Sequence, residues 1–64
     1  PDCGVVGVEV KLAAAVSDSD GKHLRWLRDQ LGSRFVDGLI ITTGPTAYRR
    51  RDGIAVVPLA LFGP

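Results

Sequence analysis

Crosslinking residues are almost absent from this sequence of 64 residues, which contains one Cys, one His and no Met. A single cysteine excludes an internal disulfide, and one Cys with one His cannot form a closed zinc site. A chain this short buries only about 60% of the surface that its unfolded form exposes, so its stability is marginal without such crosslinks. We therefore expect residues 1–64 to be a single fragment of a larger domain, or to form an oligomer.

Long apolar runs and a strong net charge are lacking too. The longest apolar stretch, residues 54–62, is interrupted by Pro58 and is too short to span a bilayer. No charged segment precedes an apolar run at the start, so we expect neither a signal peptide nor a membrane partner. The net charge is only +1, which provides no global attraction to nucleic acid. With the lone thiol of Cys3, these features predict a cytoplasmic protein.

Residues 5–11 have the alternating pattern of a β-strand. Three valines, at positions 6, 8 and 10, would share one face, whereas Glu9 and Lys11 would share the other with Gly7. β-Branched residues at this density favour a strand strongly. One face of the strand is thus apolar throughout, and the helix that follows is expected to cover one face only.

A helix is predicted from about Asp20 to Leu31. Leu24, Leu27 and Leu31 follow helical spacing and form one apolar stripe. Residues 17–20 are two serines and two aspartates, which are candidate N-caps and place negative charge at the helix N-terminus. Gly32 is suited to end the helix because it can adopt a positive φ.

One further strand and a hairpin are predicted after the helix. Phe35–Thr43 forms a strand whose continuous apolar run, 39–41, is typical of the interior of a parallel sheet that is covered on both faces. Residues 47–50 and 54–57 flank an Asp-Gly turn and predict a hairpin, and residues 59–62 would close the chain as a helical turn. A strand–helix–strand unit has a right-handed crossover, so strands 5–11 and 35–43 should be parallel in a small α/β fold.

Glu9 and Lys11 are the residues whose spacing suits chemistry. Two residues apart on a strand, they lie on one face roughly 7 Å apart at the backbone. A carboxylate could hold a divalent cation there while the ammonium stabilises a phosphate, although one carboxylate is not enough for Mg²⁺. The alternative is that both side chains are simply solvated on the open side of the sheet.

The segment Gly4-Val5-Val6-Gly7-Val8-Glu9-Val10-Lys11 carries a family resemblance, together with the Leu-rich helix, residues 35–44 and residues 54–59. Over essentially the whole chain it resembles the C-terminal domain, without assigned function, of a prokaryotic family of AAA-type ATPases. The order of a strand with E-x-K, a helix and a parallel strand is similar to the core of the PD-(D/E)xK superfamily. The implied fold is a fragment of a restriction-endonuclease-like core, strand–helix–strand with a C-terminal hairpin.

This resemblance implies roles for the E-x-K pair. Glu9 matches the second acidic metal ligand and Lys11 the lysine of the motif, so both would be catalytic, with Mg²⁺ as cofactor in the intact parent and none expected for the fragment. The first Asp of the motif and the ATPase module of the same parent chain would lie upstream of Pro1. Residues 1–64 contain nothing resembling a phosphate-binding glycine-rich loop.

Outside the motif, three consecutive arginines, Arg49, Arg50 and Arg51, are candidate contacts to nucleic-acid phosphates. The alternative is three solvated side chains at a hairpin end, since no aromatic residue is interleaved with them. His23 has no partner visible in the sequence and is expected at the surface. Cys3 has no neighbouring base and is expected to be inert.

Two functions remain open at this stage. The first is a nuclease-like domain fragment, inactive alone and associated with nucleic acid in its parent, so whether it acts as an enzyme is undecided. The second is a non-catalytic binding or oligomerisation module with a degenerate nuclease-like fold. In the second case the first strand would present an unpaired edge through which copies of the chain could form a homo-oligomer.

Overall fold

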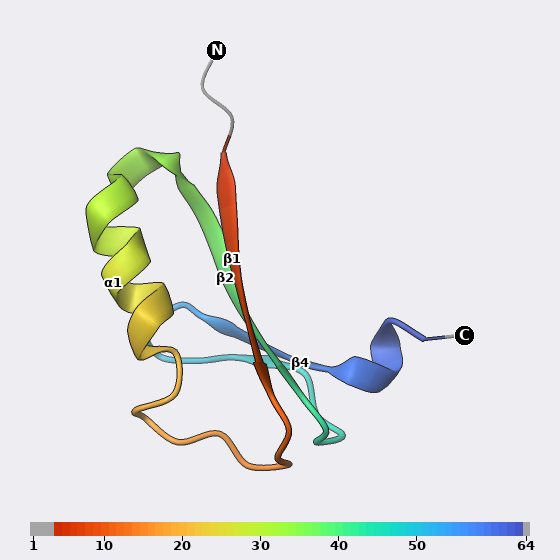
Figure 1. The fold of residues 1–64 in the computed structure, drawn as a ribbon. Helices are drawn as coiled ribbons and strands as arrows, with labels where there is room; N and C mark the ends of the chain where they lie inside the picture. Colours follow the sequence, from red (N-terminus) through yellow and green to blue (C-terminus); the bar gives the residue numbers. More distant parts are fainter. Residues whose placement is uncertain (1–3, 64) are drawn as a thin grey trace.

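The computed structural model describes residues 4–63, which form a four-stranded sheet with one helix packed on one of its faces (Figure 1). In chain order the elements are β1 (Val5–Lys11), α1 (Lys22–Leu31), the 3-10 turn η1 (Gly32–Arg34), β2 (Phe35–Thr42), β3 (Tyr48–Arg49), β4 (Ala55–Pro58) and the 3-10 turn η2 (Leu59–Leu61). The predicted small α/β fold is confirmed. Cys3, predicted to be inert, lies outside the described residues.

The strands are arranged in the order β1-β2-β4-β3. β2 is parallel both to β1 and to β4, and β3 is antiparallel to β4, so the predicted parallel pair and hairpin are confirmed. The apolar run of β2 does lie in the interior of the sheet. It is not covered on both faces, however, because Leu39 and Ile41 are half-exposed on the face opposite α1.

The core lies between α1 and the sheet. Leu24 is buried against Ile40, Ile54 and Val56, with Val16 packed at the border. Close approach of the helix depends on Gly7, which pairs with Gly38 across β1 and β2. A Cβ added to Gly7 would lie 2.6 Å from a Leu24 methyl carbon, so only glycine leaves room for the leucine stripe here.

The helix begins differently from the prediction. It starts at Lys22 instead of Asp20, and its N-cap is Gly21 in a left-handed conformation, without a side-chain cap. The predicted acidic capping is wrong because the Asp20 carboxylate bonds to Lys11 and to the backbone of Ser17 instead. At the other end Gly32 has the expected positive φ, 56°. No helix in the part of the chain that the structure describes is long and apolar enough to cross a membrane.

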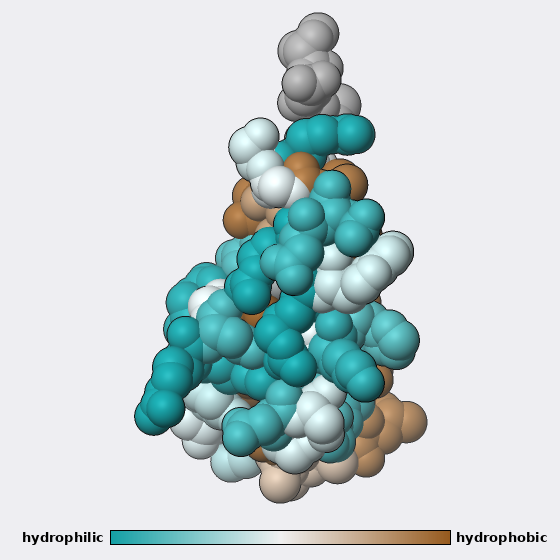
Figure 2. All heavy atoms as spheres, turned by 90° about the vertical axis from the view of Figure 1, so that its left-hand side faces the viewer, coloured by the Kyte–Doolittle hydropathy of each residue, from teal (hydrophilic) through white to brown (hydrophobic). Residues whose placement is uncertain are grey.

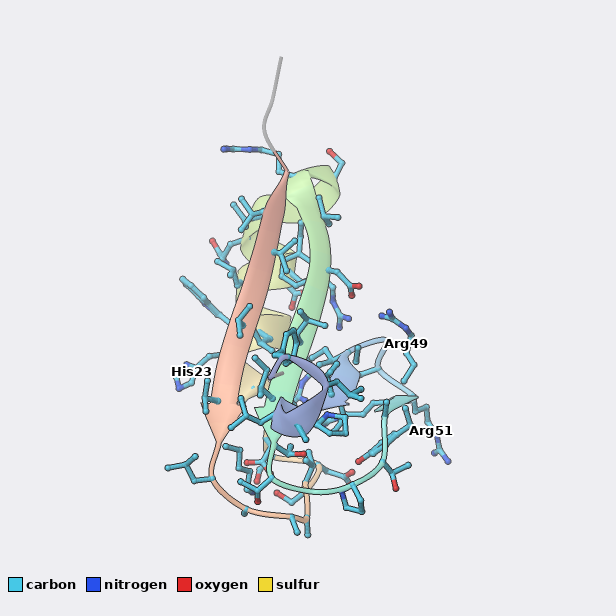
Figure 3. All side chains as sticks on the ribbon, turned by 90° about the vertical axis from the view of Figure 1, so that its right-hand side faces the viewer. His23, Arg49 and Arg51 are labelled. Carbon is cyan, nitrogen blue, oxygen red and sulfur yellow. The ribbon has the colours of Figure 1, made fainter. Side chains whose placement is uncertain are left out.

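The two faces of the sheet differ in cover and polarity. The side that carries α1 is largely hydrophilic at its surface (Figure 2). The opposite side of the sheet has no covering layer among residues 4–63, and η2 projects from it (Figures 1 and 3). β1 is the outermost strand on one side, so the edge expected to be unpaired is present in this fold.

Candidate functional site

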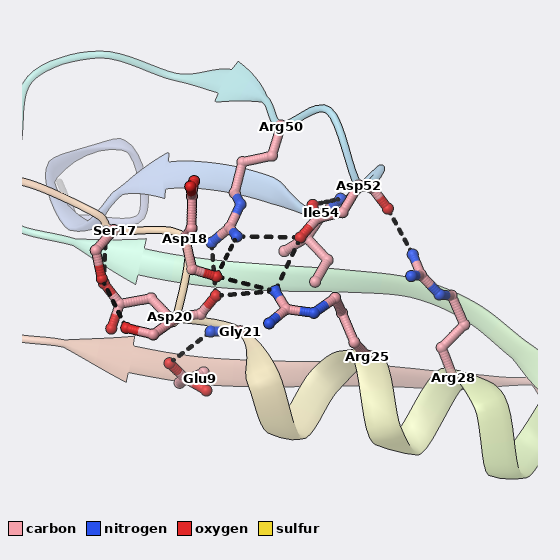
Figure 4. A network of polar contacts seen from close by, with 11 residues as sticks. Glu9, Ser17, Asp18, Asp20, Gly21, Arg25, Arg28, Arg50, Asp52 and Ile54 are labelled. Carbon is pink, nitrogen blue, oxygen red and sulfur yellow. Dashed lines mark hydrogen bonds and ion pairs between the residues drawn. The ribbon is translucent and has the colours of Figure 1, made fainter.

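Glu9 and Lys11 lie on the face of β1 that α1 covers, as their shared parity with Gly7 requires. Both side chains are half-buried. The Gly21 N–H donates to Glu9 Oε2 at 3.3 Å, and Lys11 Nζ forms an ion pair with Asp20 (Figure 4). The interpretation of these two residues as solvated on the open side of the sheet is therefore wrong. They attach the segment before α1 to the sheet.

Asp20 is the acceptor at the centre of these contacts. Its Oδ2 accepts hydrogen bonds from Lys11 Nζ, from the Ser17 backbone N–H at 2.7 Å and from Ser17 Oγ at 3.1 Å. Only 18% of its side chain is exposed. These donors, Lys11 first, lower the pKa of Asp20 from 3.8 to about 2. Asp20 thus stays ionised and paired at neutral pH, and the Lys11 ammonium is engaged.

Glu9, the candidate metal ligand, has few other candidate ligands around it in the described residues. No group of three or more His, Cys, Asp or Glu side chains gathers between residues 4 and 63. Mg²⁺ prefers octahedral oxygen ligation. The carboxylate of Asp20, the residue before the Gly21 N–H that Glu9 accepts, already pairs with Lys11. The catalytic and metal-binding roles of Glu9 and Lys11 stay predictions.

A small opening of about 360 Å³ lies between β1 and α1, and Glu9 lines it with His23 and Trp26. His23 is exposed, as expected, and Figure 3 shows it beside β1, across the sheet from the hairpin arginines. Helical position brings this histidine near Glu9, a proximity that its sequence context did not indicate.

The three consecutive arginines have three different environments. Arg49 forms a bidentate ion pair with Asp37, at 2.9 and 3.2 Å, and is exposed. Arg50 turns inward, and only 11% of its side chain is exposed. Arg51 is exposed and forms no hydrogen bond or ion pair within residues 4–63. Adjacency in sequence therefore does not make them one surface of equivalent charges.

Arg50 connects the hairpin to the segment before α1. Its guanidinium donates to the Asp20 carbonyl at 2.7 Å and the Asp18 carbonyl at 3.2 Å, and it pairs with Asp52 at 3.0 Å (Figure 4). Arg25 reaches Asp52 from α1 at 3.1 Å. Burial raises the pKa of Asp52, but the Ile54 N–H and these two guanidinium groups outweigh burial, so the pKa lies below its usual value.

An open depression of about 760 Å³ adjoins this network. All three hairpin arginines line it, together with Arg25, Tyr48, Val16, Ser17, Asp18 and Asp52. Four arginines against two aspartates leave its lining with an excess of two positive charges. The depression therefore brings the predicted arginine residues to one place, although Arg50 and Arg25 are already paired there.

A second surface was not predicted from the sequence. We call it the open face: Val6, Val8, Val10, Leu39 and Ile41 on the sheet side opposite α1, with Leu59, Leu61 and Phe62 beside them. The three β1 valines are 49–60% exposed, and Leu59, Leu61 and Phe62 are 50–67% exposed. The signal that could have identified it is Gly7, whose missing side chain marks the helix-covered face and so assigns the valines to the other one.

Comparison with known families identifies the family to which the chain belongs. A family model described as a domain of unknown function, DUF4143, matches residues 2–62. The chain belongs to this family. No curated protein and no solved structure matches it. Membership in DUF4143 agrees with the part of the resemblance that pointed to a domain without assigned function. The AAA-type ATPase context and the PD-(D/E)xK relationship stay predictions.

Proposed function

We propose that this DUF4143 chain is a non-catalytic interaction module that binds another polypeptide surface through the open face. The observation that carries the proposal is the direction of the β1 valines, which point away from the only helix of the described residues. Parallel sheets such as β1-β2-β4 occur almost only with both faces covered. An apolar face of this kind on a parallel sheet is typical of a docking surface.

The contacts of the E-x-K pair support a structural role over a catalytic one. A lysine that assists hydrolysis needs an ammonium available to the phosphate, whereas Lys11 pairs with Asp20. Glu9 in turn accepts the Gly21 N–H at the start of α1. The competing hypothesis is that the chain is part of a longer, nuclease-like parent protein that uses Mg²⁺ and carries an ATPase module.

A cleavage assay separates the two hypotheses. Purified wild-type chain, Glu9→Gln and Lys11→Met are incubated with Mg²⁺ and single- or double-stranded nucleic acid, after circular dichroism confirms that each is folded. We expect equal background signals from all three. Mg²⁺-dependent cleavage that disappears in both variants would contradict a non-catalytic module.

Cysteine labelling tests whether the open face is covered. In a Cys3→Ser background, Val8→Cys reports on the open face and Asp29→Cys on the exposed side of α1. Both variants are produced at natural level in the host organism and treated with a membrane-permeant maleimide. We expect Val8→Cys to react at least about tenfold more slowly than Asp29→Cys, as a site excluded from water would. Equal rates would refute the proposal.

A second candidate function, phosphate-backbone binding, is favoured by the excess positive charge of the depression that Arg49, Arg50 and Arg51 line. Arg51 has no partner within residues 4–63 and would make the main contact. Fluorescence anisotropy with single-stranded DNA at several salt concentrations tests this, with Arg34→Ala as control for loss of one exposed arginine. Selective weakening by Arg51→Ala would support binding at this site.

A further inference from the structure

We infer that the polypeptide covering the open face is a second copy of this chain, packed face to face. This inference rests on the proposed function and names the partner. Three features of the face carry it: its area, its electrical neutrality and its shape.

The area of the open face matches what a stable dimer needs. Half to two-thirds of each of six residues is accessible, which corresponds to roughly 600 Å² in all, and the half-exposed Leu39 and Ile41 increase the total toward 800 Å². A standard interface takes about 800 Å² from each partner. The face is therefore large enough for one copy to cover another.

The charges on this side allow an identical partner. By strand register Asp37 shares the face of Val6, and Arg49 shares the face of Leu39 through Ala55. These two charges form a bidentate pair at the border of the apolar residues. The face thus has an apolar centre and a neutralised charged rim, so two copies can meet without repulsion between like charges.

The shape of the open face suits two-fold symmetry. The valines lie in a row along β1, whereas η2 stands out from the same side of the sheet (Figures 1 and 3). In a dimer with a two-fold axis, a projecting part of one copy meets a flat part of the other, and the reverse contact is the same. Each η2 would then cover the β1 valines of the partner copy.

Sedimentation of three lysine variants tests the inference. Val8→Lys and Leu61→Lys place a charge on the strand and the turn of the open face, respectively. Trp26→Lys is the matched control, because Trp26 is also apolar and 61% exposed but lies on α1. All three add the same charge. We expect the wild-type chain to dimerise with a dissociation constant below about 0.5 mM. Both open-face variants should raise this dissociation constant at least about 30-fold, and the control should change it less than about threefold.

Several results would overturn the inference. A folded wild-type chain that stays monomeric at about 0.5 mM excludes the dimer. If Trp26→Lys weakens the dimer as much as the open-face variants do, the open face is not the specific interface. A dimer that survives Leu61→Lys would instead be formed through the edge of β1. If Val8→Lys does not fold by circular dichroism, Leu61→Lys decides alone. Maleimide protection of Val8→Cys in the host together with a monomeric purified chain would refute this inference while leaving the proposed function standing.

Discussion

Replacing Arg50 with alanine should remove a large part of the stability of this small fold, whereas replacing its neighbour Arg51 should not. Arg50 makes three contacts of 2.7–3.2 Å, one of them to a carboxylate, and is 11% exposed. Hydrogen bonds of charged groups contribute about 1.5–3 kcal/mol each, and Arg25 still reaches the same three acceptors after the change. We therefore expect a net loss of about 2–4 kcal/mol.

This loss is large in relation to the whole fold. A chain of 64 residues has a free energy of unfolding of about 3–10 kcal/mol. With a urea dependence of about 1 kcal/mol/M, Arg50→Ala should lower the unfolding midpoint by about 2–4 M. Arg51→Ala removes the same charge from an exposed side chain and should change stability by less than about 0.5 kcal/mol. Equal midpoints for the two variants would refute the assignment of Arg50 to the connection between hairpin and helix.

Three further predictions concern the sheet and its attachments. The Asp20 pKa of about 2 lies below the ordinary 3.8, so the stabilisation that the ionised carboxylate provides is complete above about pH 4 and is lost as the pH falls toward 2. Lys11→Met should raise this pKa, and NMR titration of the carboxyl group measures the change. Ile40→Ala empties a fully buried position and should cost about 2–5 kcal/mol in urea unfolding, or unfold the chain. Gly44→Ala places a Cβ 2.6 Å from the Ala14 carbonyl oxygen, which cannot move alone, and should cost about 1–3 kcal/mol in the same assay; no loss would contradict this packing.

The sequence was sufficient for the local elements because their patterns are local. Alternation and valine content predicted the strand at 5–11 with the bounds that the structure has. Leucine spacing predicted the helix to Leu31, and the Asp-Gly turn predicted the hairpin. The rule that strand–helix–strand crossovers are right-handed then predicted the parallel pairing of β1 and β2.

The sequence was insufficient where two distant segments compete for one group. Residues 17–20 have the composition of a helix cap, but Asp20 bonds to Lys11, nine positions earlier, and Gly21 begins the helix instead. Likewise, nothing in three consecutive arginines indicates that only the middle one turns inward. That choice depends on the carbonyls of residues 18 and 20, which the fold brings beneath the hairpin.

The candidate site was predicted in position but not in surroundings. Glu9 and Lys11 do share a face of β1, yet an alternating strand has two faces and its pattern does not state which one the helix takes. Gly7 decides this, because a Cβ there would lie 2.6 Å from a Leu24 methyl carbon of α1. That contact joins two segments distant in sequence, so the alternation of the strand alone does not reveal it.

The position of β1 has a consequence for how the chain is made. Its partners in β2 lie about 30 residues later in the sequence, from Val5 with Phe35 to Lys11 with Thr42. At about 5–20 residues per second, the valine strand emerges from the ribosome roughly 2–6 s before the strand that pairs with it. During that interval Glu9 and Lys11 are the only charges within β1. Before they attach the helix segment, they serve the nascent strand as charged residues that oppose aggregation.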